Sequence, residues 1–281
     1  DGDVKIDLDN TQKQTFETEI NDYFIDTLIE QVIEDLMEEY DCNENVASTM
    51  LYNGGYKIYS TVNPQIQEAM EEVYLNVDKY FPYKGENLQG ETVHSQSAMT
   101  IMDYDGKIVG IVGGAGEKTV NRGLNRAYSV PRQPGSTMKP LATYAPAIAQ
   151  DLITYSSILN DTKTSYNGWT PVNWYGSYWG NVTTQYALER SINAIPVYLV
   201  NKMTPQKSYD FLTQKLGITT LNEEDINLSP LGMGGTNGGL TTIESAAAFA
   251  VFGNGGQYYE PAFYTQVTDQ EGKVVLERKP T

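Results

Sequence analysis

The sequence has 281 residues, enough for one large domain or for a main domain with a smaller companion. Apolar residues make up 40% of it, so the chain can bury a core and wholesale disorder is excluded. The 36 acidic residues outnumber the 19 basic ones and give a formal charge of −17, which argues against nucleic acid and against an anionic membrane surface as partners. No apolar run reaches the ~20 residues of a membrane span and no signal peptide is visible, so we expect any anchor or export signal to lie outside these residues.

The N-terminal part of the chain is predicted to be a linker followed by a helix. Residues 1–15 are polar and show no periodicity. From Phe16 to Tyr40 apolar residues such as Phe24 and Leu28 recur every three to four positions, which predicts an amphipathic helix. The other face of this helix is acidic and carries much of the negative charge. We interpret it as a solvated surface rather than a cation site.

A strand, a second helix and a connector are predicted next. Residues 56–62 alternate and are rich in aromatic and β-branched side chains, as expected of a strand. Asn63 and Pro64 are typical of the N-cap and first residue of a helix, which we expect to run to about Tyr80. Residues 82–96 are polar and are interpreted as a connector.

The middle of the chain contains the clearest hairpin signal. Residues 97–104 and 107–112 have strand character, and the Asp105-Gly106 pair between them is typical of a tight turn. A long helix is expected to begin near Ser136. Residues 151–181 are rich in Tyr, Trp, Asn and Gly and are interpreted as a loop.

The C-terminal third is predicted to be mainly helical. Helices are expected over 183–190, 196–202, 205–216 and 241–252, and a last hairpin over 263–276. Because helices and strands are mixed without regular alternation, the sequence favours an α+β fold over a doubly wound sheet.

Single residues limit the possible chemistry. Cys42 is the only cysteine, so an internal disulfide or a multi-cysteine metal site is excluded, and we expect it to be structural or incidental. His94 is the only histidine and lies in a polar connector, where a solvated loop residue is expected. We expect no metal ion or cofactor. If the chain is a nucleophilic enzyme, lysine is the natural candidate for its base.

Two glycine-rich segments resemble nucleotide-binding loops without meeting their requirements. In residues 110–119 Glu117 separates the last glycine from Lys118, whereas a phosphate-binding loop needs lysine directly after glycine. Residues 231–239 have no preceding strand and no nearby basic residue. We interpret the first segment as the exit from the hairpin and the second as a mobile connector near a cleft.

The pair Ser136 and Lys139 carries the strongest chemical signal. Pro134-Gly135 forms a turn that begins a helix, and residues three positions apart share one helix face, so the spacing can place a hydroxyl beside an amine. The helix start also offers unpaired N–H groups to an oxyanion that forms beside Ser136. A second pair, Ser191 and Asn193, can point into the same cleft, with Ser191 shuttling a proton and Asn193 orienting an amide substrate.

These motifs resemble a known family. Ser-x-x-Lys followed by Ser-x-Asn is the signature of penicillin-binding proteins and serine β-lactamases. The flanking sequence narrows the resemblance to the class A, bifunctional penicillin-binding proteins, and the similar segments span roughly residues 20–275. They are residues 52–67, 125–140, 171–174 and 241–250.

Two features of that family are missing from this sequence. Its third motif, Lys-Thr-Gly, is absent, since Lys118-Thr119 is followed by Val120 and no other Lys-Thr pair precedes glycine. Its glycosyltransferase domain would precede residue 1. The resemblance therefore implies a serine β-lactamase/penicillin-binding-protein-like transpeptidase fold, incomplete in this chain. Residues 1–96 would be an α/β linker region, and 97–281 the N-terminal part of the transpeptidase domain.

The resemblance also implies a function. Ser136 would attack peptidoglycan stem peptides ending in D-Ala-D-Ala, with Lys139, Ser191 and Asn193 as its catalytic partners, and β-lactam antibiotics would acylate the same serine. A second fragment of the same protein, carrying Lys-Thr-Gly, would complete the site, and no nucleic acid is expected. The protein would lie at the extracytoplasmic face of a bacterial membrane, anchored by an N-terminal span outside this chain.

The sequence also offers candidates for substrate binding and leaves alternative functions open. Trp174, Gly234 and Thr236 are the candidates for substrate binding, because their loops are expected to border the cleft. A β-lactamase, a β-lactam sensor and a non-catalytic cell-wall-binding module remain as alternatives to the transpeptidase.

Overall fold

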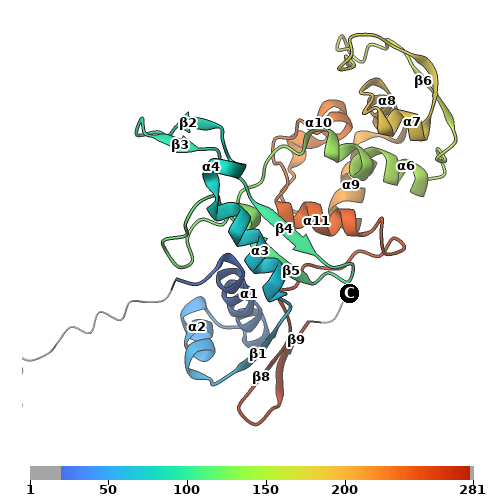
Figure 1. The fold of residues 1–281 in the computed structure, drawn as a ribbon. Coiled ribbons are helices and arrows are strands. Elements are labelled where there is room, and N and C mark those ends of the chain that lie inside the picture. The colour runs from blue at the N-terminus through green and yellow to red at the C-terminus, as the bar shows by residue number, and fades with distance from the viewer. Residues whose placement is uncertain (1–19, 279–281) are drawn as a thin grey trace, which may run out of the picture.

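A two-stranded antiparallel sheet lies at the centre of the computed structural model, which describes residues 20–278 (Figure 1). Its strands are β4 (Met99–Met102) and β5 (Ile108–Val112), and Gly106 in the turn between them has a positive φ of 85°. The hairpin predicted here is confirmed. Helix α3 (Pro64–Leu75) packs on β5 and helix α11 (Thr242–Ala250) on β4, so both strands are covered by helices.

The first described helix is α1 (Tyr23–Tyr40), which confirms the amphipathic pattern; the part of that prediction before residue 20 lies outside the described residues. The Asp22 side chain caps it by accepting a hydrogen bond from the Ile25 N–H. Phe24 and Leu28 are buried on one face, and helix α2 (Glu44–Asn53), which the sequence did not predict, packs against α1.

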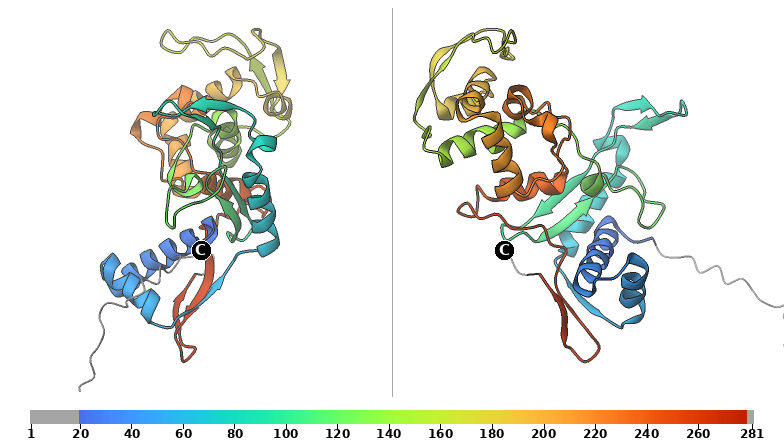
Figure 2. Two further views of the ribbon diagram at one scale, coloured as in Figure 1. Left: turned by 60° about the vertical axis from the view of Figure 1, so that its left-hand side comes forward. Right: turned by 180° about the vertical axis from the view of Figure 1, so that it is seen from behind.

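Segments from the two ends of the described chain form one three-stranded sheet. Strand β1 (Lys57–Ser60) pairs antiparallel with β8 (Tyr264–Thr268), which pairs with β9 (Val274–Glu277). Figure 2 shows β8 and β9 extending beside β1, next to α1. The predicted C-terminal hairpin is confirmed. Phe24 and Leu36 of α1 share a hydrophobic core with Phe263 and Val267, so residues 20–96 pack firmly on the rest of the protein.

The structure corrects two predictions between residues 63 and 96. The expected single helix is broken at Asn76 into α3 and a short α4 (Val77–Tyr80), because Asn76 has non-helical backbone angles. The expected connector contains a hairpin, β2 (Lys84–Glu86) and β3 (Thr92–His94). His94 was expected to be a solvated loop residue. It lies in β3 and is partly buried, and its ring donates from Nδ1 to the Phe81 carbonyl at 2.7 Å.

A helical lobe contains the second and larger hydrophobic core (Figure 1). The segment expected to be a loop over 151–181 instead contributes two paired strands, because Leu159 packs into this core. The elements of the lobe are α6 (Ala145–Ala149), β6 (Ile158–Asp161), β7 (Gly180–Thr183), α7 (Thr184–Glu189), α8 (Ala194–Met203), α9 (Pro205–Lys215), η4 (Glu223–Asp225) and α10 (Leu228–Met233). Helices α7, α8, α9 and α11 confirm the predicted ones within a few residues.

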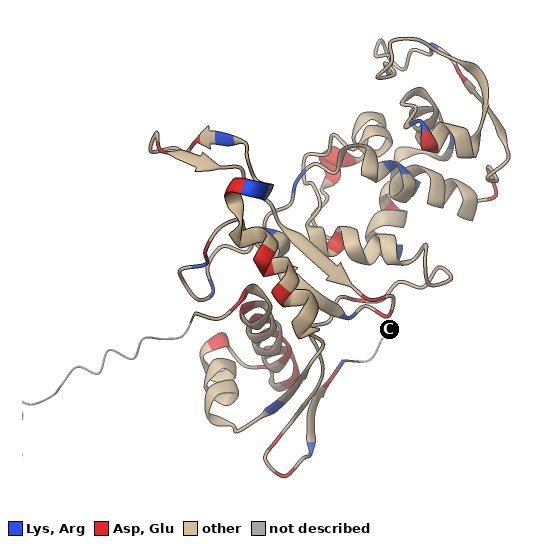
Figure 3. Ribbon diagram, viewed as in Figure 1, with Lys and Arg blue, Asp and Glu red and all other residues tan. Residues whose placement is uncertain are grey.

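The sequence also bears on membrane spans, metal-ligand clusters and the position of the acidic side chains. Within residues 20–278 no helix is long and apolar enough to cross a membrane, and no three His, Cys, Asp or Glu side chains are grouped as a metal site. Acidic residues are spread along α1 and α3 (Figure 3). Glu34 and Glu38 of α1 are exposed, as the sequence predicted, but Asp35 on the same helix binds Arg278.

Candidate active site

Ser136 lies on a tight turn at the edge of the helical lobe. It is exposed and belongs to η2 (Gly135–Thr137), a single 3₁₀ turn. Gly135 begins the turn with a positive φ of 58°, a conformation that glycine adopts without strain. Among the described residues, the Ser136 hydroxyl has no hydrogen-bond partner, so it is free to meet a substrate.

Lys139 is buried directly behind this turn. It begins η3 (Lys139–Tyr144), which is π-helical, and only 1% of its surface is exposed. The missing N–H of Pro140 accounts for a local departure from α-helical bonding, a feature often found at functional sites. The predicted long helix is therefore three short pieces: η2, η3 and α6.

The Lys139 amine joins two residues that lie far along the chain. Its Nζ donates to the Ser191 carbonyl at 2.8 Å, to Ser191 Oγ at 3.0 Å and to Asn193 Oδ1 at 2.6 Å. Burial lowers the pKa of Lys139 to about 8 from its ordinary 10.5. A neutral amine has a lone pair, which can then accept the Ser191 hydroxyl proton instead of donating to it.

Ser191 occupies an unusual backbone conformation at the end of α7. Its φ is +49°, a left-handed conformation that costs a non-glycine residue roughly 1–2 kcal/mol. The Ser191 N–H bonds the Leu188 carbonyl and the Ile192 N–H bonds that of Ala187, which is the Schellman pattern of a helix end. Glycine is the usual residue at this position, so serine is kept there at a cost in stability, as at many functional sites.

Asn193 is held in place by its neighbours on a facing loop. Its N–H donates to Asn173 Oδ1 at 2.9 Å and its Nδ2 donates to the Val172 carbonyl at 2.8 Å. Because the side-chain amide is fixed from that side, its Oδ1 faces the Lys139 amine. The sequence offered Ser191 and Asn193 as candidates, and the structure brings both onto Lys139.

The three candidate substrate-binding residues take different positions. Trp174 is 70% exposed, and its indole N–H donates to the Arg190 carbonyl at 2.9 Å, beside Ser191. Thr236 is completely buried, and its carbonyl accepts from the Gln133 side chain. Gly234 lies under the serine turn, where its carbonyl accepts from the Gly135 N–H at 3.1 Å. Side-chain contact with a substrate is therefore open only to Trp174.

The glycine-rich segment 231–239 is tied to this turn, which corrects its interpretation as a mobile connector. A Cβ on Gly234 would lie 1.8 Å from the Gly135 carbonyl oxygen, so only glycine allows this approach. The buried carboxylate of Asp225 accepts from the N–H groups of Asn237 and Gly238. The segment forms a rigid support because its backbone is bonded on both sides.

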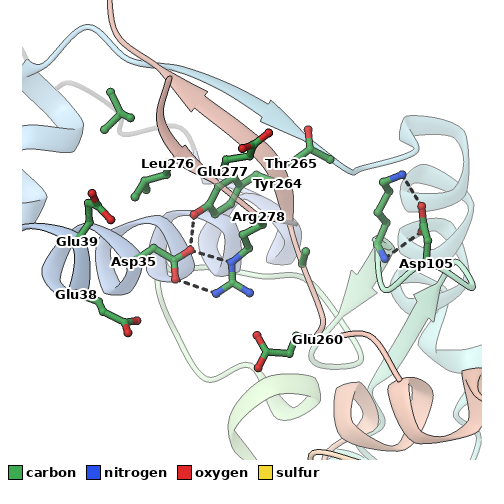
Figure 4. Close-up of a pocket in the computed structure, with 13 residues that line it drawn as sticks. Asp35, Glu38, Glu39, Asp105, Glu260, Tyr264, Thr265, Leu276, Glu277 and Arg278 are labelled. Atoms are coloured by element: carbon green, nitrogen blue, oxygen red, sulfur yellow. Dashed lines mark hydrogen bonds and ion pairs between the residues drawn. The ribbon is translucent and has the colours of Figure 1, made fainter. Parts of the chain in front are cut away.

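Two other features lie apart from Ser136. The Lys118 amine pairs with Asp26 of α1 at 2.6 Å, so the Lys118-Thr119 pair does not stand in for the missing third motif. A cavity of about 550 Å³ lies between α1 and the β8–β9 hairpin (Figure 4). Figure 4 shows Asp35 and Arg278 joined in this cavity among acidic side chains, and none of the candidate site residues lines it.

Sequence reasoning missed the support for the site. Asn173 and Asp161 are both buried and hydrogen-bonded to each other at 2.8 Å, and Asn173 bonds the start of α8. Asn173 stands in a segment that already resembled the class A proteins, but nothing local in the sequence indicates its bonding partners.

An exposed serine on a turn, followed three residues later by a buried lysine, is the arrangement expected of proteins that carry the Ser-x-x-Lys motif. Residues 97–281 match the family model described as the penicillin binding protein transpeptidase domain. The chain belongs to this family.

Named relatives agree with this assignment. Penicillin-binding protein 1A of Clostridium acetobutylicum is 34% identical over 281 residues, and the match covers 95% of this chain and 34% of that protein. Penicillin-binding protein 1F of Bacillus subtilis is 30% identical over 256 residues, covering 91% of this chain and 33% of the relative. The chain thus spans about a third of the length of these curated relatives.

Solved structures show the same fold. PonA1 of Mycobacterium tuberculosis, in complex with penicillin V, superposes with a TM-score of 0.71 at 23% identity, covering 90% of this chain and 65% of that one. Penicillin-binding protein 1A of Haemophilus influenzae gives a TM-score of 0.68 at 19% identity, covering 94% of this chain and 51% of the other. The α+β transpeptidase fold expected from the sequence is confirmed, and this chain covers 65% and 51% of those two solved chains.

Proposed function

We propose that this chain is part of a serine D,D-transpeptidase that cross-links peptidoglycan stem peptides through an acyl-enzyme on Ser136. The observation that carries the proposal is the contact of the buried Lys139 amine with Ser191 and Asn193, directly behind an exposed serine. In a chain that belongs to the transpeptidase family, these residues offer a nucleophile in Ser136, a base in Lys139 and a proton carrier in Ser191, which Lys139 contacts.

The acylation step follows from these positions. Ser136 Oγ attacks the carbonyl of the penultimate D-alanine while its proton passes to neutral Lys139. Ser191 then carries a proton toward the leaving nitrogen, and D-alanine departs as the amine. An amine from a neighbouring stem peptide attacks the ester and regenerates Ser136. A positioned base is typically worth about 10²–10⁴ in rate, and its lowered pKa supports Lys139 in that role.

Substrate contacts are proposed for the residues around the cleft. The exposed indole of Trp174 is available to pack on the peptide. One N–H of Asn193 Nδ2 bonds the Val172 carbonyl, which leaves its second N–H to donate to a substrate amide. For Gly234 and Thr236 we propose an indirect role, in which they support the Ser136 turn.

The division of the chain is also proposed here. Residues 1–96 are a linker region and 97–281 the N-terminal part of the transpeptidase domain, and the family model begins at residue 97. The segment carrying Lys-Thr-Gly comes from a further part of the same protein, in the same chain or as a second fragment. Strand β4 supports this, because within residues 20–278 it pairs only with β5 and has an open edge.

Location and partners follow from the substrate. Stem peptides lie outside the cytoplasmic membrane, so the domain is proposed to act there, anchored by a span elsewhere in the protein. β-Lactams are proposed to acylate Ser136. PonA1, a protein of similar fold, has been solved with penicillin V. The glycosyltransferase activity of class A proteins is proposed for the whole protein and not for this chain.

Covalent labelling by a fluorescent penicillin tests the proposal. The whole protein should be labelled at Ser136, as located by peptide mass, and Ser136→Ala should remove the label. Thr137→Ala is the matched control, since Thr137 is the exposed neighbour and its hydroxyl bonds only the Pro134 carbonyl. Undiminished labelling of Ser136→Ala would rule out the assignment.

The alternatives differ in the fate of the acyl-enzyme. A β-lactamase hydrolyses the penicilloyl ester quickly, whereas a transpeptidase holds it for long periods and releases D-alanine from a stem peptide when an amine acceptor is added. A sensor would acylate without releasing D-alanine. A cell-wall-binding module would not be labelled even in the whole protein.

A further inference from the structure

Asp161 is a buried carboxylate with a full set of hydrogen-bond donors, close to the site but outside its motifs. It ends strand β6, and only 1% of its surface is exposed. Its Oδ1 accepts from Asn173 Nδ2 at 2.8 Å, and its Oδ2 accepts from the Tyr175 hydroxyl at 2.8 Å and from the Trp179 N–H at 2.9 Å. A buried carboxylate is costly unless it is bonded in this way, so its position is well defined.

Asn173 links Asp161 to the start of helix α8 through hydrogen bonds. Its Nδ2 is held by Asp161 and by the Ser177 carbonyl, so its Oδ1 must point the other way. There it accepts from the N–H groups of Asn193 at 2.9 Å and Ala194 at 3.1 Å. These are unpaired donors at a helix start, and Asn193 has no side-chain cap of its own.

The same hydrogen bonds determine where Asn193 presents its side chain. The Asn193 backbone is fixed by Asn173, and its Nδ2 is fixed by the Val172 carbonyl, one residue before Asn173. Its remaining polar atom, Oδ1, then lies 2.6 Å from Lys139 Nζ. A continuous chain of hydrogen bonds thus runs from Asp161 through Asn173 and Asn193 to the amine.

Aromatic rings pack together beside this series of hydrogen bonds. Tyr175 and Trp179 stack with centroids 3.9 Å apart, and Trp174 meets Tyr175 edge-on. Burial, together with the hydrogen bond to Asp161, raises the pKa of the Tyr175 hydroxyl. It therefore stays protonated and keeps donating to Asp161.

We propose that Asp161 and Asn173 are positioning residues for acyl transfer: Asp161 orients the Asn173 amide, which holds Asn193 against Lys139. The proposal rests on the function proposed above. Neither residue touches the substrate. They act by keeping the amine aligned with Ser136, and a misplacement of about 1 Å at such a site can cost roughly 10²-fold in rate.

The test separates binding from acylation in the whole protein. Stopped-flow labelling at several concentrations of fluorescent penicillin yields the dissociation constant of the non-covalent complex and the rate constant of acylation. Asn173→Ala is expected to lower the acylation constant by roughly 10²-fold while the dissociation constant changes little. Asn173→Asp is expected to be slow as well, because it sets two carboxylates against each other.

A donor–acceptor exchange provides the sharper comparison. In the double variant Asp161→Asn/Asn173→Asp, the new amide at 161 donates to the new carboxylate at 173, which still accepts from Asn193 and Ala194. The hydrogen bond to the Ser177 carbonyl is lost and two oxygen atoms face each other there, but Asn173→Asp alone carries the same cost. The exchange keeps side-chain size, so it should acylate at least tenfold faster than Asn173→Asp alone, in line with about 1.4 kcal/mol per tenfold change.

Asn125→Ala is the matched control. Asn125 is also a buried asparagine that caps a short helix, α5 (Arg126–Ser129), but it bonds Thr27 of α1. It should lower the melting temperature and leave the acylation constant unchanged. Wild-type acylation in Asn173→Ala, or a double variant no faster than Asn173→Asp, would overturn the positioning role. Absence of labelling in the wild-type protein would overturn the proposed function and this role together.

Discussion

At the residue scale, Lys139 is the group on which the proposed chemistry depends. A lysine in water is protonated at neutral pH and cannot act as a base, but burial lowers the pKa of this one to about 8. Its partners Ser191 and Asn193 offer oxygen atoms without a charge, so they solvate the amine without restoring the full preference for the cation. Burial of an amine that has hydrogen-bond partners but no carboxylate beside it disfavours its charged form, and in the proposed mechanism the neutral form is the reactive one.

The first prediction concerns pH. Below pH 8 the Lys139 amine is mostly protonated, so the rate of acylation by penicillin should rise with pH and level off above an apparent pKa at or below about 8. A second cation in the completed site would lower that value further. Rate constants measured from pH 5 to 10 check this. Lys139→Ala should be slow and should lose the dependence on pH. A wild-type rate that is still rising steeply at pH 10 would contradict the role of Lys139.

The second prediction separates the backbone of Ser191 from its hydroxyl. Ser191→Gly and Ser191→Ala both remove the proton carrier and should slow acylation by roughly 10²–10⁴-fold. Only glycine relieves the left-handed backbone, so the glycine variant should be more stable than the alanine variant by roughly 1–2 kcal/mol. Denaturant unfolding of the two variants measures the difference. Equal stabilities would show that the conformation is not strained.

At the element scale, the serine turn is positioned by a segment that lies about a hundred residues further along the chain. Residues 132 and 240 form an antiparallel bridge, and the Gly135 N–H bonds the Gly234 carbonyl. The turn itself is a single 3₁₀ turn that leads into a π-helical segment, so few local hydrogen bonds hold it. Its geometry therefore depends on the glycine-rich segment beside it.

The third prediction tests this dependence. Gly234→Ala places a methyl group 1.8 Å from the Gly135 carbonyl oxygen at a residue with φ of 78°, so the turn must shift. Acylation should fall together with the melting temperature. Gly235→Ala is the control, because a Cβ there has open space and the residue has no positive φ. If Gly234→Ala is acylated at the wild-type rate, the Ser136 turn keeps its geometry without support from the glycine-rich segment.

At the scale of the whole molecule, the proposed linker region and the proposed domain are joined by a common core. Strand β1 pairs with β8, and α1 packs against residues near the end of the described chain. Arg278 forms a two-pronged contact with Asp35 of α1 at 2.8 and 2.9 Å, and the Tyr264 hydroxyl donates to the same carboxylate (Figure 4). The two parts are expected to move as one body because breaking this contact exposes a shared core.

The fourth prediction tests how much the Arg278–Asp35 contact contributes to stability. Arg278→Met leaves the half-buried Asp35 without its cation and should lower the free energy of unfolding by about 1–3 kcal/mol. Lys107→Met removes an exposed ion pair with Asp105 that lines the same cavity, and should change stability little. Thermal melts of the two variants make the comparison. Equal losses of stability in the two variants would contradict a special role for the Arg278–Asp35 contact.

The sequence by itself determined the features that depend on neighbours along the chain. Asp105-Gly106 specifies a hairpin, Asn63-Pro64 starts a helix, and Ser136 and Lys139 lie within one turn because of their spacing. The spacing alone did not specify a 3₁₀ turn and a π-helical segment, which depend on Pro140 and on the packing of Lys139. The order of the motifs also indicated the family and the missing Lys-Thr-Gly.

Only the tertiary structure decided which distant residues meet. The contact of Lys139 with Ser191 and Asn193 requires η3 and α8 to pack in one core, and no local pattern encodes that distance. The contact of Asp161 with Asn173 is a second example, because both residues lie in a segment that the sequence predicts to be a loop. Short-range spacing is set by backbone geometry, whereas long-range contacts are set by how buried faces fit together, and that fit exists only in the folded chain.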